Sequence, residues 1–120
     1  MTTIRSRKNK GKKLQKEVQN SLLESFPQLE QDDIRNAIMG EPGVDLKLSP
    51  AARKLIPFSI ECKNVEKVNI WKAIEQSEDN IIPNTTPIVV FRKNRSETYV
   101  AIKYTDFLTL IKPQKIEENS

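Results

Sequence analysis

Apolar residues recur with a helical period in the first part of the chain. Over residues 14–26 they stand at every fourth position: Leu14, Val18, Leu22 and Phe26. This spacing predicts a helix with one apolar stripe, and Pro27 predicts where that helix ends. A second, shorter helix is predicted over residues 30–39. Acidic residues open it, and its inward positions are Ile34, Ala37 and Ile38.

Apolar and polar residues alternate one by one after residues 40–43, where two glycines and a proline break the chain. This alternation predicts strands over residues 44–48 and 58–63. Residues 50–55 connect the two strands, with one helical turn expected. In the second strand one face carries Phe58, Ile60 and Cys62, and the other carries Ser59, Glu61 and Lys63. Cys62 is therefore expected to be a small core residue that faces away from Glu61.

The rest of the chain predicts a helix, two strands and a last short helix. Asn69 can cap a helix over residues 70–80. The apolar run at residues 88–91 is typical of a strand buried on both faces, and residues 98–102 predict another strand. A last helix begins at Thr105 or Asp106 and runs to residue 111. The order α-β-β-α-β-β-α predicts an α/β fold, with a mixed central sheet flanked by helices.

Basic residues gather at one end of the chain. Lys and Arg number 20 against 16 Asp and Glu, which gives a net charge of +4. Residues 1–16 contain no acid and hold seven of these basic residues. We therefore expect a flexible basic arm over residues 1–13, a single domain over residues 14–112 and a polar tail over residues 113–120. The arm favours contact with nucleic-acid phosphates, through Arg5, Arg7, Lys8, Lys10, Lys12 and Lys13.

Residue usage excludes several kinds of site. The chain has no histidine, so it has no Ser-His-Asp triad and no Cys-His nucleophile pair. Cys62 is the only cysteine, which excludes an internal disulfide and a Cys/His zinc site and favours a reducing compartment such as the cytoplasm. Neither a signal peptide nor a membrane span is expected. Catalysis would need carboxylates, lysines or a metal held by oxygen ligands.

Asp45 and the pair Glu61 and Lys63 offer that chemistry. If their two strands are neighbours, the carboxylates of Asp45 and Glu61 meet, and they repel unless a cation lies between them. Mg²⁺ prefers such oxygen ligands, and the backbone carbonyl of Cys62 could add another. Lys63 would stand beside the metal and a scissile phosphate. The competing interpretation is an ordinary exposed Glu-X-Lys pair on a strand surface.

These residues resemble the active-site motif of the PD-(D/E)XK nuclease superfamily. The resemblance lies in Gly43-Val44-Asp45 and in the run from Pro57 to Asn64, which includes Glu61-Cys62-Lys63. The match is close to small phage-type nucleases and to archaeal-type Holliday junction resolvases. Residues 71–76 resemble the helix that follows the motif in many members. One departure is Val44, which stands where the superfamily name has proline.

The resemblance implies a restriction-endonuclease-like fold and a metal-dependent DNA endonuclease. Asp45 and Glu61 would bind Mg²⁺, with Mn²⁺ able to substitute, and Lys63 would be the catalytic lysine. The family often has a glutamate in its first helix, for which Glu17 is the best match and Glu24 a competitor. Gln76 would match a polar residue on the second core helix.

The substrate is expected to be DNA, with branched junctions favoured. A protein this small has little surface for reading a long sequence, and junction resolution needs two active sites, which a homodimer supplies. Tyr99, Val100, Phe107 and Leu108 are the candidate interface. Two alternatives stay open: a restriction-like, nicking or repair nuclease with the same chemistry, and a non-catalytic DNA-binding protein.

Some residues outside the motif are weaker candidates. Further phosphate contacts are expected from Arg53, Lys54 and Lys72, and the basic turn at residues 92–95 could add others. Trp71 is expected in the core or in a subunit contact.

Overall fold

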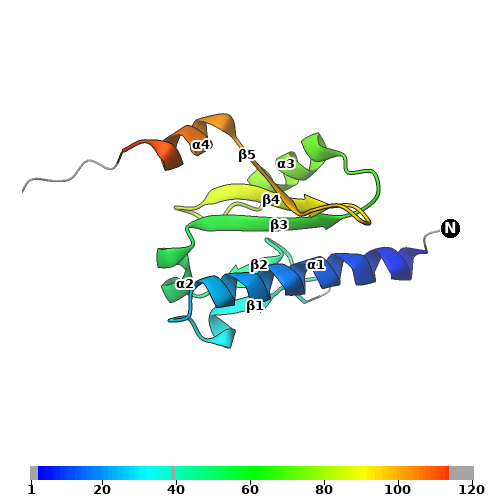
Figure 1. Cartoon of the computed structure of the whole chain (residues 1–120), viewed down its shortest axis with the longest axis horizontal. Coiled ribbons are helices and arrows are strands. Elements are labelled where there is room, and N and C mark those ends of the chain that lie inside the picture. The colour runs from blue at the N-terminus through cyan, green and yellow to red at the C-terminus, as the bar shows by residue number, and fades with distance from the viewer. Residues whose placement is uncertain (1–2, 39, 114–120) are drawn as a thin grey trace, which may run out of the picture.

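Two small sheets lie side by side at the centre of the protein (Figure 1). The computed structural model describes residues 3–38 and 40–113. The first sheet pairs two antiparallel strands, β1 (Ile34–Asn36) and β2 (Leu46–Leu48). The second has the order β3-β4-β5, in which β3 and β4 are parallel and β4 and β5 antiparallel. Its strands are β3 (Phe58–Asn64), β4 (Thr86–Arg92) and β5 (Tyr99–Ile102).

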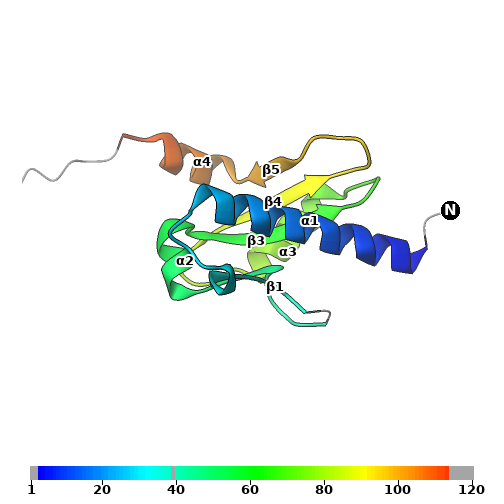
Figure 2. The same ribbon diagram turned by 60° about the horizontal axis from the view of Figure 1, so that its bottom comes forward.

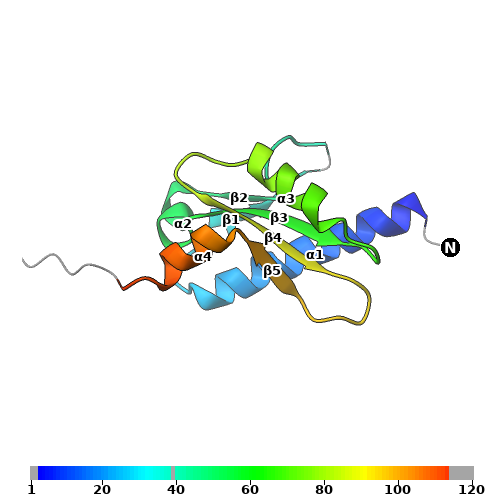
Figure 3. The same cartoon turned by 90° about the horizontal axis from the view of Figure 1, so that it is seen from above.

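The described residues form four α-helices and one short 3-10 helix around these sheets. The helices are α1 (Ile4–Ser25), α2 (Pro50–Leu55), α3 (Ile70–Asp79) and α4 (Tyr104–Ile111), and the 3-10 helix η1 spans Gln31–Asp33. Helix α1 covers the face of β3 that carries Ile60 and Cys62, and α3 covers the opposite face (Figures 1 and 3). Alternate residues of β3 therefore point toward different helices.

The hydrophobic core lies between α1 and the sheets. Leu14 projects from α1 and is 1% exposed, and it belongs to a cluster with Ile34, Leu46, Ile60 and Cys62. Val18 and Leu22 continue the same stripe along the helix and pack against that cluster. This confirms the predicted apolar stripe and the predicted core position of Cys62.

Most of the predicted elements are present, but they form two small sheets in place of the single mixed central sheet that was predicted. The structure confirms the strands near residues 44–48, 58–63, 88–91 and 98–102, the helix over residues 70–80 and the last short helix. Asn69 caps α3 as predicted, because its side-chain oxygen accepts a hydrogen bond from the backbone N–H of Lys72 at 3.1 Å. The turn over residues 50–55 is a six-residue helix with Ser49 as its N-cap.

The prediction of a flexible arm over residues 1–13 is wrong for the residues that the structure describes, because α1 begins at Ile4. Thr3 caps this helix by accepting a hydrogen bond from the N–H of Ser6. Lys and Arg are good helix formers, and the segment is also docked on the sheet. The side chain of Asn64 donates to the carbonyl of Lys10 at 2.9 Å, and Lys10 lies 3.9 Å from Glu66. Residues 114–120 of the predicted tail lie outside the described part.

The helix predicted over residues 30–39 is also wrong. This segment forms η1 and then β1, whose backbone pairs with β2. Ile34 is fully buried as predicted, but Ile38 is 71% exposed. Asp33 stabilises the 3-10 helix, because its side chain accepts hydrogen bonds from the N–H of Glu30 and from the hydroxyl of Ser49.

Two exposed regions also bear on the predictions. Trp71 is 79% exposed on α3, so it does not lie in the core, and the alternative of a subunit contact stays a prediction. The apolar residues of β5 and α4 are largely uncovered: Tyr99, Val100, Tyr104, Phe107, Leu110 and Ile111. No helix in the described ranges is long and apolar enough to cross a membrane.

Replacing Leu14 with alanine should lower the free energy of unfolding by about 3 kcal/mol, because a buried leucine leaves a cavity in the core. Urea denaturation followed by circular dichroism measures this loss. Ile4 is 70% exposed on the same helix, so Ile4→Ala is the matched control and should change the stability little. Equal effects of the two substitutions would contradict the docking of α1 on the sheet.

Candidate metal and active site

Asp45 lies where the two sheets meet, on the open edge of β3. Its backbone N–H donates to the carbonyl of Ile60 at 3.2 Å, and its side-chain Oδ2 accepts from the N–H of Cys62 at 2.7 Å. The N–H and the carbonyl of a strand residue point to the same side of the strand. The carbonyl of Cys62 therefore lies on the same edge as Asp45, as a metal ligand there would need.

The loop before Asp45 is held by ion pairs and by a glycine. Arg35 donates to both carboxylate oxygens of Glu41 at 3.1 Å, and this pairing lowers the pKa of Glu41 to about 2. Lys47 donates to the carbonyl of Pro42 at 2.6 Å. Gly43 has φ of +94°, a left-handed conformation that favours glycine. These contacts hold the loop before Asp45 in place and so position its backbone beside β3.

Glu61 is a carboxylate buried in the centre of β3. Its side chain is fully inaccessible to solvent, and Oε1 accepts a hydrogen bond from the side-chain amide of Asn80 at 2.9 Å. Oε2 is buried and has no hydrogen-bond partner among the described residues. Burying such an oxygen without a partner is costly, which makes it an available ligand for a cation.

The environment of Glu61 disfavours its charged form. The pKa of Glu61 is raised to about 7, mainly because the carboxylate is buried and in part because the carboxylate of Asp45 lies near it. The hydrogen bond from Asn80 and the positive charge of Lys63 act in the opposite direction. Asp45 and Glu61 are therefore close enough to repel one another, as their strand positions predicted.

Lys63 follows Glu61 on the same face of β3 and is held by α3. Its Nζ donates to the side-chain oxygen of Gln76 at 2.8 Å. Asn80, which contacts Glu61, stands one helical turn after Gln76, so one flank of α3 orients both side chains. The structure thus brings together four of the predicted residues: Asp45, Glu61, Lys63 and Gln76.

A cavity of about 300 Å³ opens beside Asp45 and Lys63. Helix α1 forms one wall of this cavity with Lys8, Gly11, Lys12 and Gln15. Lys8 and Lys12 therefore bring positive charge to the same space as Asp45 and Lys63. An anionic substrate entering here would meet Lys8 and Lys12 on one side and Asp45 with Lys63 on the other.

Glu17 does not lie at this site, contrary to the prediction. It pairs instead with Arg92, whose hydrogen bond lowers the pKa of Glu17. At about 100° of turn per residue, Glu17 and Glu24 lie roughly on the opposite flank of α1 from Lys12 and Gln15. Within residues 3–38 and 40–113, no group of three or more His, Cys, Asp or Glu is placed to hold a metal. The predicted third acidic ligand is therefore absent from the described site.

The other predicted DNA contacts are distributed over several surfaces. Arg53 and Lys54 line a separate cavity with residues 82–85, near the start of β3, whereas Lys63 is near its end. They therefore lie away from the cavity of Asp45, and their contact with DNA phosphates stays a prediction. Lys72 is exposed on α3, one turn before Gln76. Arg5 is exposed near the start of α1.

The sequence did not predict that Asn80 and Gln15 lie at the site. Asn80 is four residues after Gln76, so the helical period already placed both on one flank. Gln15 is harder to predict from the sequence, because which flank of α1 faces Asp45 depends on how the helix crosses the sheet.

The residues present fit a divalent cation bound by oxygen atoms. Two carboxylates that repel one another and a buried oxygen without a partner are the features that a cation between Asp45 and Glu61 would satisfy. Mg²⁺ is often held by one or two carboxylates, with water and substrate phosphate completing its ligands.

No protein-family model, curated protein or solved structure was found to match the chain.

Proposed function

We propose that the protein is a metal-dependent DNA endonuclease that hydrolyses phosphodiester bonds. The observation that carries the proposal is the carboxylate pair, in which a buried oxygen of Glu61 lacks a partner beside Asp45. Lys63 stands next to this pair and is held by Gln76. Apart from Glu17, the arrangement is the one that the PD-(D/E)XK resemblance implies, and the α/β fold with helices on both faces of β3 is compatible with a restriction-endonuclease-like architecture.

Asp45, Glu61 and the carbonyl of Cys62 would hold Mg²⁺, and Mn²⁺ is expected to substitute because it accepts the same ligands. The bound metal would polarise the phosphate and lower the pKa of a water molecule. Glu61 would bind in its charged form, although its pKa of about 7 leaves part of it protonated near neutral pH. Metal binding would therefore release protons from the site.

Lys63 would supply positive charge to the phosphate as negative charge builds up on it. Its hydrogen bond to Gln76 fixes the ammonium group before the substrate binds, so less reorganisation is needed in the transition state. Asn80 would hold Glu61 in one orientation through Oε1 and leave Oε2 directed at the metal. Lys8 and Lys12 would bind the phosphates of the strand that enters the cavity.

DNA is favoured as the substrate because the basic residues of α1 are spread along a helix beside the site. If the protein contacts about six phosphates, its affinity for DNA should fall by roughly three orders of magnitude as the salt concentration rises from 50 to 200 mM. We further propose that branched DNA is preferred and that a homodimer presents two sites to the junction.

The test is a cleavage assay with end-labelled four-way junction and linear duplex of the same sequence. Each is incubated with Mg²⁺ and, separately, with EDTA. Paired metal-dependent nicks near the branch point, with the duplex spared, would support a dimeric junction nuclease. Equal cleavage of both would support the nuclease and remove the junction preference. Binding without cleavage of either would favour a non-catalytic DNA-binding protein.

The dimer is expected to form through β5 and α4. Val100 is 56% exposed on the edge strand, and the neighbouring apolar residues of α4 are uncovered. Val100→Lys should convert the dimer to a monomer at micromolar concentration, because a charge would be buried in the interface. Light scattering after gel filtration measures the mass, and Ile4→Lys is the control on another exposed apolar position. A monomeric wild-type protein would contradict the interface.

A further inference from the structure

The basic side chains of α1 are divided between two opposite flanks of the helix. Lys8 and Lys12 line the cavity of Asp45, whereas Lys10 and Lys13 line a different cavity. At about 100° of turn per residue, the mean directions of the two pairs differ by roughly 150°. Leu14 points between them into the core. Helix α1 therefore forms a ridge, with a basic wall on each side.

The second cavity lies between α1 and the turn that joins β4 to β5, which Figures 2 and 3 show beside the helix. We call it the hairpin cleft. Its volume is about 360 Å³. Five of its lining residues are basic and one, Glu17, is acidic. The basic residues are Lys10, Lys13, Arg92, Lys93 and Arg95.

Charge in the hairpin cleft is only partly compensated. Glu17 pairs with Arg92, and Lys10 lies 3.9 Å from Glu66. Lys13, Lys93 and Arg95 form no ion pair with any residue of the described ranges. Such a cluster of cations attracts an anion that carries several charges.

The turn presents its two basic side chains to solvent. The N–H of Lys93 donates to the hydroxyl of Ser96 at 3.0 Å, which closes the turn. Arg95 adopts φ of 60°, in a region where glycine or asparagine is more common. Both Lys93 and Arg95 are exposed, so a ligand could reach them without a change in the fold.

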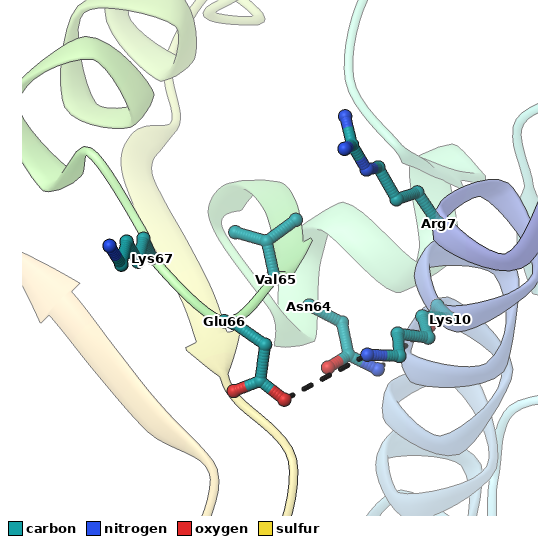
Figure 4. Close-up of a pocket in the computed structure, with 6 residues that line it drawn as sticks. All are labelled: Arg7, Lys10, Asn64, Val65, Glu66 and Lys67. Atoms are coloured by element: carbon teal, nitrogen blue, oxygen red, sulfur yellow. Dashed lines mark hydrogen bonds and ion pairs between the residues drawn. The ribbon is translucent and has the colours of Figure 1, made fainter. Parts of the chain in front are cut away.

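A neighbouring cavity extends the basic flank toward the start of α1. It shares Lys10 and Asn64 with the hairpin cleft and adds Arg7 and Lys67. Figure 4 shows Arg7 and Lys10 projecting from the helix beside the loop that follows β3, with Lys10 directed at Glu66. The positive charge therefore follows the helix over about two turns, from Arg7 to Lys13, as an extended polyanion would require.

We propose that the hairpin cleft binds a second phosphodiester backbone of DNA, other than the strand that enters the cavity of Asp45. This inference rests on the proposed function, because it assigns the cleft to the same substrate. The backbone could come from the complementary strand of the same duplex. An α-helix 10–12 Å across fits a major groove about 12 Å wide, so α1 could separate the two strands. It could also come from another arm of a branched substrate.

The experiment compares the full-length protein with K93Q/R95Q and with K103Q/K112Q. The second variant removes the same charge at the two ends of α4, away from the hairpin cleft. Fluorescence anisotropy in EDTA measures the affinity for labelled four-way junction and for linear duplex across a series of salt concentrations. Loss of two phosphate contacts should reduce the salt slope by about 2 and the affinity by roughly tenfold to a hundredfold at about 0.1 M salt.

A loss with both DNAs would support the proposal and identify the complementary strand as the second backbone. A loss confined to the junction would support it and identify another arm. Wild-type affinity and salt slope in K93Q/R95Q, or a loss equal to that of K103Q/K112Q, would overturn it. Cleavage is not used in this measurement, so failure of the nuclease proposal would be seen separately as absent Mg²⁺-dependent nicking.

Discussion

Replacing Glu61 with glutamine should reduce Mg²⁺-dependent DNA cleavage by roughly a thousandfold or more, while DNA binding in EDTA stays close to that of the wild type. Glutamine keeps the size of the side chain and one oxygen atom but removes the negative charge that the metal requires. Glu61 is fully buried, so it makes no direct contribution to the surface that meets DNA. Single-turnover cleavage of the four-way junction at saturating protein concentration measures the loss.

Glu17→Gln is the matched control for this substitution. It makes the same chemical change on α1, but Glu17 is paired with Arg92 and stands on the flank away from the cavity of Asp45. We expect it to retain cleavage within a fewfold of the wild type under saturating conditions. Full cleavage by Glu61→Gln would refute the site assignment. A large loss in Glu17→Gln would instead restore Glu17 to the catalytic group.

The strands that carry the site could be predicted from the sequence because their signals are local. The alternation from Phe58 to Lys63 reflects the two faces of one strand, which carry apolar and polar side chains although both faces are covered, and the structure has β3 there. The proximity of Asp45 to Glu61 followed from placing the two predicted strands next to one another. Gln76 was expected at the site from the resemblance and not from periodicity, and its contact with Lys63 was not predicted.

The errors concern features that depend on distant parts of the chain. Strand β1 has only three residues and is defined by its pairing with β2, so its own sequence read equally well as a helix. The basic segment is held as a helix in part by Asn64, which lies more than fifty residues away in the chain. Helical spacing placed Glu17 on a flank of the apolar stripe. Which flank faces Asp45 depends on how α1 crosses the sheet.

The last prediction concerns stability and does not depend on cleavage. Because the pKa of Glu61 is raised from its ordinary 4.5 to about 7, the folded protein binds this proton more tightly than the unfolded chain does. Stability from this group is therefore present below pH 4.5 and is lost as the pH rises through 7. Between these limits the wild type should lose roughly 3 kcal/mol relative to Glu61→Gln, which does not titrate.

Urea denaturation of the metal-free wild type and variant at several pH values between 4.5 and 8 measures this difference. The comparison cancels the carboxylates with lowered pKa, such as Glu41, which act in the opposite direction and are common to both proteins. Adding Mg²⁺ at pH 8 should raise the melting temperature of the wild type and have little effect on the variant, because a cation between Asp45 and Glu61 offsets the buried charge. Parallel pH curves for the two proteins would show that Glu61 does not carry the unfavourable charge. If the pH curves are parallel and both proteins also respond equally to Mg²⁺, the proposed metal site has no support. A bound cation can stabilise the charged form of Glu61 only if burial has made that charge unfavourable.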